Sequence, residues 1–448
     1  MRSLFALGGL SVLLLSSVAA AADRPNIVVI LADDLGYGDI GANGCRDVPT
    51  PNIDSIAKNG VRCTDGHSNH SFCAPTRAAF LTGRYQQRFG FEYNSGPSAN
   101  APENYGLPKS EQTLPERLKA MGYRTGMVGK WHLGFKDGLQ PHQRGFDEHY
   151  GFLGGSRSYV PAQNADQLIR NGKPVEQPEY TTDAFADEGV QFIKKKDNRP
   201  YFLYLAFNAI HGPMQALDRY KARFPDITDP DRKTCAGMLS ALDDGVGKVL
   251  AAIREQKADD NTLIVFFADN GGPTGVNTSS NAPYRGVKGQ VLEGGHRVAF
   301  LLQWKGKLPA GAVYDKPVAG FDVHATAIAA AGGKPLTDRP MDGVDLVPYL
   351  SGQNSGVPHE TLAWRQGGGD SWAFRKGDWK LLKMPGKESV ELYDLKEDVG
   401  ESTNLADKEA DRVKTMQAAY NAWSAQMQKP AWEQTERPRN RAKRAAAN

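Results

Sequence analysis

A cysteine, a proline and an arginine follow one another closely in the segment Ser71-Phe72-Cys73-Ala74-Pro75-Thr76-Arg77, and Gly83 follows after an apolar stretch. Proline suits the first turn of a helix and glycine suits its end, so this spacing predicts a helix from Cys73 to Gly83. Side chains four residues apart share one helix face, which brings the thiol and the guanidinium together at the N-terminus. Backbone N–H groups there favour an anion. The segment predicts a thiol at an anion site; the alternative is a disulfide cysteine before an ordinary helix.

A second segment carries a lysine and a histidine, in Gly122-Tyr123-Arg124-Thr125-Gly126-Met127-Val128-Gly129-Lys130-Trp131-His132. The two segments, in this order, resemble the two signatures of the type I sulfatases, and the likeness covers nearly the whole mature chain. In that family the cysteine is oxidised after translation to Cα-formylglycine (3-oxoalanine). The resemblance therefore implies that Cys73 is the modified nucleophile and that a formylglycine-generating enzyme acts on the chain during maturation. Thr76 stands where serine is frequent; the family accepts both.

Four apolar runs each lead into polar residues that could do chemistry. The runs are 26–32 before Asp33 and Asp34, 123–128 before Lys130 and His132, 201–207 before His211, and 262–268 before Asp269 and Asn270. Near-continuous apolar runs indicate strands buried on both faces, and hence a mainly parallel sheet with helices on either side. Helical spacing at 52–60, 114–121, 183–195 and 238–253 indicates those helices. Because ligands bind beyond the carboxyl ends of such strands, we expect one site from the four clusters.

The pattern changes near residue 345. Residues 372–375, 379–382 and 391–394 look like short antiparallel strands, and a helix follows with an apolar stripe of Val413, Met416, Tyr420, Trp423 and Met427. Segments 392–395 and 404–406 resemble the C-terminal domain of sulfatases. The resemblance implies an alkaline phosphatase-like α/β fold with a large, mainly parallel sheet. We expect a signal peptide at 1–22, a catalytic domain at 23–345, a small C-terminal α+β domain with an antiparallel sheet at 346–430, and a basic, disordered tail at 431–448.

The polar residues after two of the runs form an all-oxygen set. Asp33, Asp34, Asp269 and Asn270 offer hard ligands that favour calcium or magnesium over zinc. Adjacent buried carboxylates repel each other unless a cation or a proton relieves them. The alternative is helix capping by the aspartates and a turn at the asparagine. The resemblance implies a metal on these four positions, with an oxygen of the modified Cys73 completing the shell. We expect Ca2+, with Mg2+ as the second choice.

Chemistry and matched position together assign roles to the remaining polar residues. Arg77 would orient the modified residue, and Lys130 and Lys288 would bind sulfate oxygens. Lys288 lies in a segment, 284–295, that resembles a third family motif. The two candidate proton carriers are His132, as the base that releases sulfate, and His211, as the acid for the leaving alcohol. Ser156 matches a sulfate-contacting serine of some family members.

A hydrated aldehyde at Cys73 would supply two hydroxyl groups. One would attack sulfur and displace the alcohol, and loss of the second hydroxyl's proton would then expel sulfate, so one difficult step becomes two. His296 and Arg297 follow the third motif where many members carry an apolar residue. We expect His296 to contact substrate, with a packed histidine as the alternative. Trp364, Arg365, Trp372 and Arg375 are candidates for the pocket wall, although tryptophans of a small domain, Trp372 above all, are also typical of its core.

Composition and the N-terminal pattern argue against a nucleic-acid-binding protein and a membrane-spanning protein. Charged residues make up 23% of the 448 residues and the net charge is +3, which gives no indication of a nucleic-acid partner. The N-terminal residues have a basic start, an apolar run and small residues at 20–22, as in a signal peptide. The run is shorter than the about 20 residues of a spanning helix. We expect a periplasmic or secreted protein without a stable membrane anchor. Cys45 and Cys63 could form a disulfide in that compartment, and Cys235 is the remaining thiol.

The sequence therefore predicts a hydrolase of sulfate monoesters, with a sulfated carbohydrate as substrate. Export, many glycines and prolines, and polar residues near Lys288 favour a hydrophilic pocket. A phosphonate or phosphate monoester hydrolase of the same superfamily is one alternative. A non-catalytic glycan-binding relative is another, and a disulfide-stabilised binding protein with a structural calcium is a third.

Overall fold

The structure of the chain, a computed structural model, describes residues 24–96, 105–163 and 166–433. Its largest element is a ten-stranded mixed sheet in the order β11-β2-β10-β9-β1-β8-β4-β5-β6-β7. The strands are β1 (Asn26–Ala32), β2 (Val61–Cys63), β4 (Arg124–Lys130), β5 (Glu148–Phe152), β6 (Ile169–Arg170), β7 (Lys173–Pro174), β8 (Tyr201–Ala206), β9 (Thr262–Ala268), β10 (Phe300–Gln303) and β11 (Ala312–Tyr314). A separate pair joins β3 (Gly66–His67) to β12 (Val318–Ala319).

The centre of this sheet is parallel, as expected for its apolar strands. β1 pairs in parallel with both β8 and β9, and β4 pairs in parallel with β8 and β5. Antiparallel pairing is confined to the flanks, where β10 pairs with β9 and β2, and β6 pairs with β5 and β7. All four apolar runs of the sequence are among the five central parallel strands. Their carboxyl ends consequently meet at one edge of the sheet.

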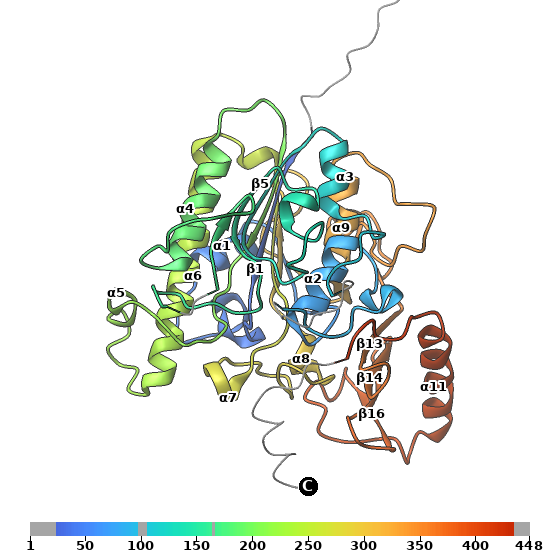
Figure 1. Cartoon of the computed structure of the whole chain (residues 1–448). Coiled ribbons are helices and arrows are strands. Elements are labelled where there is room, and N and C mark those ends of the chain that lie inside the picture. The colour runs from blue at the N-terminus through green and yellow to red at the C-terminus, as the bar shows by residue number, and fades with distance from the viewer. Residues whose placement is uncertain (1–23, 97–104, 164–165, 434–448) are drawn as a thin grey trace, which may run out of the picture.

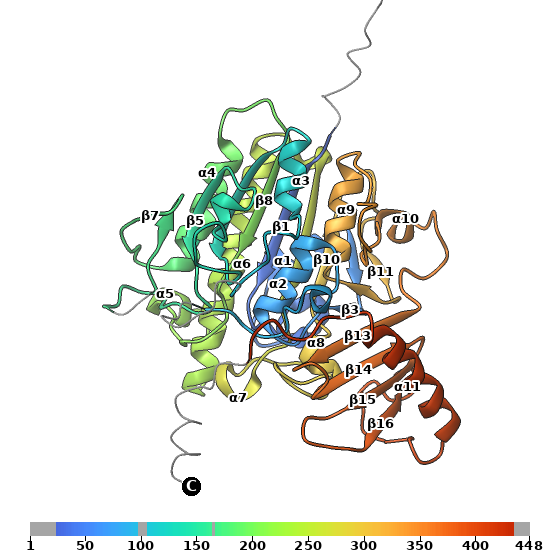
Figure 2. The same ribbon diagram turned by 45° about the vertical axis from the view of Figure 1, so that its right-hand side comes forward.

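Helices cover both faces of the sheet (Figures 1 and 2). Alternate residues of β1 show why: Val28 and Ile30 belong to one buried cluster, whereas Ile27 and Val29 belong to the other. The α-helices are α1 (Pro51–Lys58), α2 (Cys73–Thr82), α3 (Leu114–Ala120), α4 (Thr181–Lys194), α5 (Asp218–Lys221), α6 (Pro230–Glu255), α7 (Thr274–Asn277), α8 (Glu293–His296), α9 (Asp322–Ala330), α10 (Val347–Leu350) and α11 (Ala410–Ser424). Short 3₁₀ turns are at Tyr37–Asp39, Gly41–Asn43, Gln86–Phe89, Pro141–Gln143 and Asp259–Asn261.

The helices expected from spacing are present as α1, α3, α4 and α6, and the helix at the first signature is α2. α1, α4 and α6 pack on one face of the sheet, and α2, α3 and α9 pack on the other. The architecture is the α/β arrangement that the sequence predicted, a large and centrally parallel sheet with helices on both faces.

A small antiparallel sheet with one helix stands beside the large sheet (Figure 2). Its strands are β13 (Thr361–Gln366), β14 (Ser371–Lys376), β15 (Trp379–Lys383) and β16 (Val390–Asp394), paired in that order, and α11 packs on β14 and β15. Three strands and the helix match the sequence analysis, and β13 is an additional strand. Leu346 and Leu350 belong to the core under α2 and α9. These two residues of the expected small domain thus pack with the large sheet.

The C-terminal segment stays packed further than expected. Trp432 lies within the range assigned to the tail, yet it is 8% exposed and contacts Phe91 and Tyr105 edge to face. The remainder of the expected tail, from residue 434, and the expected signal peptide at 1–22 both lie outside the described residues.

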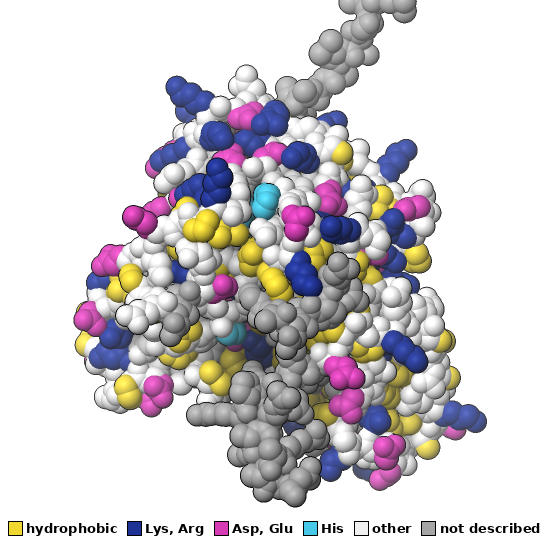
Figure 3. Space-filling model, viewed as in Figure 1, with side chains coloured by type: hydrophobic (Ala, Val, Ile, Leu, Met, Phe, Trp, Pro, Cys, Tyr) yellow, Lys and Arg dark blue, Asp and Glu magenta, His cyan; other side chains and the backbone are white. Residues whose placement is uncertain are grey.

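The four cysteines are all within the described part of the chain, and each has a free thiol. The disulfide considered between Cys45 and Cys63 is therefore not formed. Cys63 is buried on β2, whereas Cys45 is partly exposed with its sulfur 3.3 Å from Asp47. Among the described residues, we find no helix with the length and apolar character to cross a bilayer. Acidic and basic side chains are interspersed over the face seen in Figure 3, in keeping with the small net charge.

Candidate active site

The ends of β1 and β9 bring four oxygen-bearing side chains together. The two strands pair in parallel from Asn26 and Thr262 to Ala32 and Ala268, so the residues that follow them are neighbours. The Asp269 amide donates to the Ala32 carbonyl at 3.1 Å, and the Asp34 amide lies 3.4 Å from Asp269 Oδ1. The side-chain nitrogen Nδ2 of Asn270 donates to Asp34 Oδ1 at 2.7 Å. Asp33, Asp34, Asp269 and Asn270 are all buried, as one group.

Helix α2 points its N-terminus at this group. Gly83, with φ of 69°, ends the helix by donating to the Ala79 carbonyl. Cys73 lies in the first turn, with its sulfur 3.5 Å from Asp33 Oδ1. Arg77 is fully buried and donates through Nε and Nη2 to Asp269 Oδ2, at 2.9 and 2.8 Å. The predicted meeting of thiol and guanidinium at one helix end is therefore present.

Two lysines lie beside the adjacent aspartates. Lys130, at the end of β4, lies 2.5 Å from Asp33 Oδ2 and is fully buried. Lys288, from the loop before α8, lies 2.6 Å from Asp34 Oδ1 and 3.2 Å from the Cys73 sulfur. A cation thus stands beside each of the adjacent carboxylates, and Lys288 also lies beside the Cys73 sulfur.

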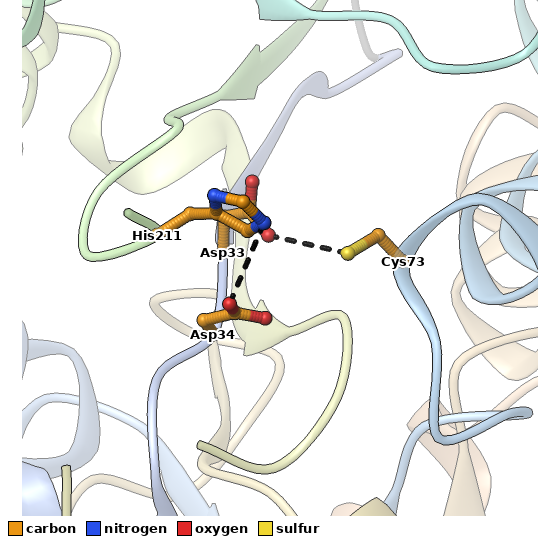
Figure 4. A group of neighbouring side chains, drawn as sticks. All are labelled: Asp33, Asp34, Cys73 and His211. Carbon is orange, nitrogen blue, oxygen red and sulfur yellow. Dashed lines mark hydrogen bonds and ion pairs between the residues drawn. The ribbon is translucent and has the colours of Figure 1, made fainter. Parts of the chain in front are cut away.

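His211 approaches from the loop after β8 (Figure 4). Its Nε2 is 3.6 Å from Asp34 Oδ2, and its Nδ1 is 2.6 Å from the carbonyl of Gly212. That carbonyl can only accept, so Nδ1 carries the proton and Nε2 is the atom that faces the site. The Asp33, Asp34, Cys73 and His211 ligand atoms lie within 4.8 Å of one another.

His132 lies just beyond Lys130 and is 5% exposed. Its φ is 61°, and among the described residues its Nδ1 has no hydrogen-bond partner. A Cβ on Gly155 would lie 2.6 Å from His132 Nε2, so glycine at 155 leaves room for the imidazole. The neighbouring Ser156 is exposed.

Burial and the neighbouring charges set the protonation of the site. Burial raises the pKa of the Cys73 thiol to about 12, with Asp269 acting in the same direction. Burial and the cations Lys130 and Arg77 hold the pKa of His132 well below its ordinary value, so its imidazole is neutral and can accept a proton. Against the burial penalty, Lys130 and the other cations lower the pKa of Asp33, whereas burial and Asp33 raise the pKa of Asp269.

The residues present fit a hard divalent cation. Asn270 is fully buried, and its Oδ1 has no hydrogen-bond partner in the described part of the chain, as expected of an oxygen meant for a ligand. The three aspartates are balanced by Arg77, Lys130 and Lys288. A dication added together with a monoanionic ester and an ionised nucleophile would preserve this balance. Carboxylate and amide oxygens are the donors that calcium and magnesium prefer.

The family model named Sulfatase matches residues 25–333. The chain belongs to the sulfatase family. It is accordingly a sulfuric ester hydrolase, as the sequence predicted.

Relatives of known name agree with this assignment. N-acetylgalactosamine-6-sulfatase of Canis lupus familiaris is 33% identical over 359 residues, which are 75% of this chain and 67% of that protein. A solved structure of Ps i-CgsB in complex with k-i-k-neocarrahexaose is 36% identical with a TM-score of 0.87, and the match covers 95% of this chain and 98% of that one. The phosphonate monoester hydrolase of Agrobacterium radiobacter shares the fold at 20% identity and a TM-score of 0.64, over 90% of this chain and 95% of that one.

The surroundings of His296 differ from those expected of a substrate contact. His296 is fully buried, stacks on Trp364 at 3.9 Å, and contacts His67 and Lys380. It belongs to a buried group between the two domains, called here the junction cluster. The cluster consists of Asp65, His67, Glu293, His296, Arg297, Arg375, Lys380 and Glu401. These contacts favour the packed-histidine alternative for His296.

The four candidates for the pocket wall are also buried. Arg375 pairs with Asp65, Arg365 pairs with Glu92, and Trp372 stacks on Tyr420. Their exposed fractions, with that of Trp364, range from 2% to 6%. Arg365, Arg375 and Trp364 join the small sheet to the large domain, whereas Trp372 packs against α11 in the core of the small domain. Aromatic rings and guanidinium groups serve a packed interface as well as a sugar site.

Supporting residues at the site carry no motif that would identify them. The Tyr159 hydroxyl donates to the carbonyls of Asn208 and His211, at 2.5 and 2.7 Å. The side-chain nitrogen Nδ2 of Asn277 donates to the backbone carbonyls of Asp34 and Ile210, at 3.1 and 3.3 Å. Both hold the backbone that presents His211 and Asp34. The sequence gives no periodicity or motif at either position.

Proposed function

We propose that this sulfatase hydrolyses sulfate esters on a sulfated carbohydrate, with Cys73 converted to formylglycine and one Ca2+ at the strand ends. The observation that carries the proposal is the convergence of Cys73, two lysines and a histidine on the aspartate group. Lys288 Nζ lies 3.2 Å from the Cys73 sulfur and 2.6 Å from Asp34. An anion held there would meet the nucleophile and positive charge together.

Each side chain has one role in this proposal. Arg77 holds Asp269 and the end of β4 in place, since it also donates to the Lys130 carbonyl at 2.8 Å. Lys130 and Lys288 bind the sulfate oxygens and offset the negative charge that grows on them. His211, doubly protonated, gives its Nε2 proton to the leaving alcohol; Asp33 and Asp34 favour this form, against burial, which lowers the pKa of the ring. Neutral His132 accepts the proton whose loss releases sulfate. Ser156 remains a proposed sulfate contact beside Gly155.

The ion would be held by Asp33, Asp34, Asp269 and Asn270, together with an oxygen of the modified Cys73. When bound, it would lower the pKa of the nucleophilic hydroxyl and draw charge from the ester. An unmodified thiol is a soft ligand for calcium and stays protonated at neutral pH, since burial raises its pKa to about 12. The aldehyde hydrate instead supplies a hard oxygen at the same position.

The carbohydrate substrate is supported by two relatives. One is named an N-acetylgalactosamine-6-sulfatase, and Ps i-CgsB was solved with a hexaose bound. A polar site at the strand ends, with Ser156 exposed at its margin, suits a hydroxyl-rich ligand. We further propose a periplasmic or secreted location and maturation by a formylglycine-generating enzyme.

The test compares the specificity constant kcat/KM for aryl sulfate, aryl phosphate, and sulfated mono- and oligosaccharides from algal and animal polysaccharides. We expect the highest value with one of the saccharides. Preference for the aryl sulfate over every saccharide would refute the carbohydrate substrate, and preference for the phosphate would favour the alternative hydrolase. Mass spectrometry of the Cys73 peptide, from a host with the maturation machinery, should show the aldehyde.

A further inference from the structure

The loop that carries Lys288 rests directly on α8. The Gly294 amide donates to the Arg285 carbonyl at 2.7 Å. A Cβ on Gly294 would lie 2.4 Å from the Gly286 carbonyl oxygen, and one on Gly295 would lie 2.0 Å from that of Gln290. Backbone therefore touches backbone along this contact. A displacement of α8 would move the loop with it, because no flexible side chain separates them.

The small domain fixes α8 through Glu293. Glu293 Oε1 accepts from Lys380 Nζ at 2.8 Å, and the Glu293 amide donates to Glu401 Oε2 at 2.7 Å. Lys380 also lies 2.9 Å from Glu401 Oε1. Lys380 comes from β15 and Glu401 from the segment after β16, and both side chains of this pair are fully buried. Removing either charge would leave another buried charge short of a partner.

Strand β16 and the segment after it hold the other end of the loop. Arg285, three residues before Lys288, donates to the Glu401 carbonyl at 2.5 Å and lies 3.4 Å from the Tyr393 hydroxyl of β16. Both flanks of the Lys288 loop are thus attached to the small domain, while its centre is attached to the site through Lys288.

We propose that Lys380 is a positioning residue for catalysis: by holding Glu293, it fixes α8 and so places Lys288 against Asp34 and Cys73. The inference rests on the proposed role of Lys288 in binding sulfate. It gives the small domain a part in turnover, although its own side chains at this junction are buried away from the substrate.

A general role in joining the domains is the competing explanation, and the chain offers a control for it. His359, before β13, lies 2.9 Å from both carboxylate oxygens of Asp322 on α9. This pair also joins the small domain to the large one and is also buried. It contacts neither α8 nor the Lys288 loop among the contacts described. A substitution of His359 should therefore weaken the junction between the domains without disturbing the contacts that link Lys380, through α8, to Lys288.

The experiment is a double-mutant cycle on the full, matured enzyme. It compares Lys380→Met, Lys288→Ala and the double variant, with His359→Gln as the junction control and Lys380→Arg as the conservative variant. Activities are measured well below the lowest Tm of the set. We expect Lys380→Met to lower kcat about tenfold or more in the wild-type background, and less than about twofold in the Lys288→Ala background. Lys380→Arg should recover part of the loss, and His359→Gln should lower Tm while kcat stays within about twofold.

Hydrogen exchange supplies a second readout. Lys380→Met should speed exchange of the amides at 284–292, and His359→Gln should not. Equal losses in both backgrounds, or a loss of kcat in His359→Gln as large as in Lys380→Met, would overturn the inference. If Lys380→Met does not fold, Glu401→Gln enters the same cycle with the same expectations. Wild-type turnover in Lys288→Ala would instead refute the proposed role of Lys288, which separates failure of the site from failure of the positioning.

Discussion

Two buried groups in this sulfatase contain the same numbers of acidic, basic and histidine side chains. They differ in how fully the polar atoms of those side chains are hydrogen-bonded. The catalytic group contains three aspartates, Arg77, two lysines, and the two histidines His132 and His211. The junction cluster also contains three acidic residues, three basic residues and two histidines, His67 and His296. Composition and burial alone would not tell which one performs chemistry.

Hydrogen bonding separates them. Both histidines of the junction cluster are neutral, because burial lowers their pKa values. One proton arrangement joins them in a chain: Lys380 donates to His296 Nε2 at 3.1 Å, His296 Nδ1 donates to His67 Nδ1 at 3.1 Å, and His67 Nε2 donates to Asp65 at 2.9 Å. Every ring nitrogen in this chain has a partner. Glu401 Oε1 has no hydrogen bond in the described part of the chain but lies 2.9 Å from Lys380 Nζ, so the charges of the cluster are paired with one another, as in a group that holds structure.

The catalytic group is incomplete by the same measure. Within the described residues, Asn270 Oδ1 and His132 Nδ1 have no partner. The side chain of His211 is 23% exposed and that of Lys288 is 12% exposed, whereas Lys380 and His296 are at 0%. Unused atoms and a route to solvent distinguish the site, since a substrate must supply the missing contacts.

The largest expected effect comes from Cys73. Cys73→Ala should lower kcat by at least about 10⁴-fold, because it removes the nucleophile and leaves no second group to attack sulfur. Tm should change little, since only one small buried atom is lost. The assay is turnover of a sulfate ester, followed with thermal unfolding.

Cys63→Ala is the matched control, because Cys63 is equally buried on β2. It should keep kcat within about twofold. Substantial turnover by Cys73→Ala would show that the nucleophile lies elsewhere and would remove the main contrast between the two groups.

Metal binding should also be confined to one group. We expect one Ca2+ per chain, and exhaustive chelation or Asp269→Ala should lower kcat by about 10²- to 10³-fold. The geometry of His67, Glu293 and His296 could also accommodate an ion, since their ligand atoms lie within 4.8 Å of one another. Lys380 and Arg297 already neutralise Glu293 there, so a second ion is not expected.

Elemental analysis of the purified enzyme measures this directly. His296→Ala should leave the calcium content at one per chain, and Asp269→Ala should abolish it. Stoichiometric zinc, or calcium lost with His296, would contradict the assignment of the two groups.

Strand pattern and motif spacing were enough to predict the sheet and the residues at its parallel strand ends. Apolar runs buried on both faces have few alternatives, and Asp33, Lys130 and Asp269 follow such runs immediately. The position of His296 was not predictable, because its contacts come from β3 and β15, far away in sequence. The contacts of Arg375 and Trp364 were not predictable for the same reason. Residue type gives no information on whether a guanidinium or an indole contacts substrate or a partner domain.

Substitution of Arg375 sharpens this point with a smaller effect. Arg375 Nη1 donates to Asp65 Oδ1 at 2.7 Å, and Arg297 remains 3.3 Å from the same oxygen. Arg375→Met should lower the free energy of unfolding by roughly 3 kcal/mol, at the lower end for a broken buried pair. KM for a sulfated saccharide should stay within about twofold of wild type.

Urea denaturation and saccharide kinetics check the two halves of this prediction. The exposed neighbour Lys376 provides the control, and Lys376→Met should change neither quantity appreciably. A large rise in KM with unchanged stability would return Arg375 to the pocket wall.

The smallest expected effect is a pH dependence of stability at the other junction pair. Burial opposes the charged form of His359, but Asp322 outweighs it and raises the pKa of His359 above its ordinary value of 6.5. A raised pKa in the folded state means that the ion pair stabilises fully below the unfolded pKa and is lost as pH rises through the folded pKa. His359→Gln should therefore lower Tm more at pH 6 than at pH 9. At pH 6 the free energy of unfolding should fall by roughly 1–3 kcal/mol.

His149→Gln is the matched control for that measurement. His149 is buried on β5, its ring nitrogens have no partner in the described ranges, and burial lowers its pKa to about 3. It stays neutral in the folded enzyme from pH 6 to pH 9, whereas the unfolded chain takes up a proton as pH falls towards 6. Its substitution should therefore cost slightly less stability at pH 6 than at pH 9, which is opposite in sign to the effect expected for His359→Gln. A loss for His359→Gln that is equal at the two pH values, or larger at pH 9, would show that His359 is neutral in the folded enzyme. The pair with Asp322 would then be an ordinary hydrogen bond, and the junction would contain no histidine that titrates near neutral pH.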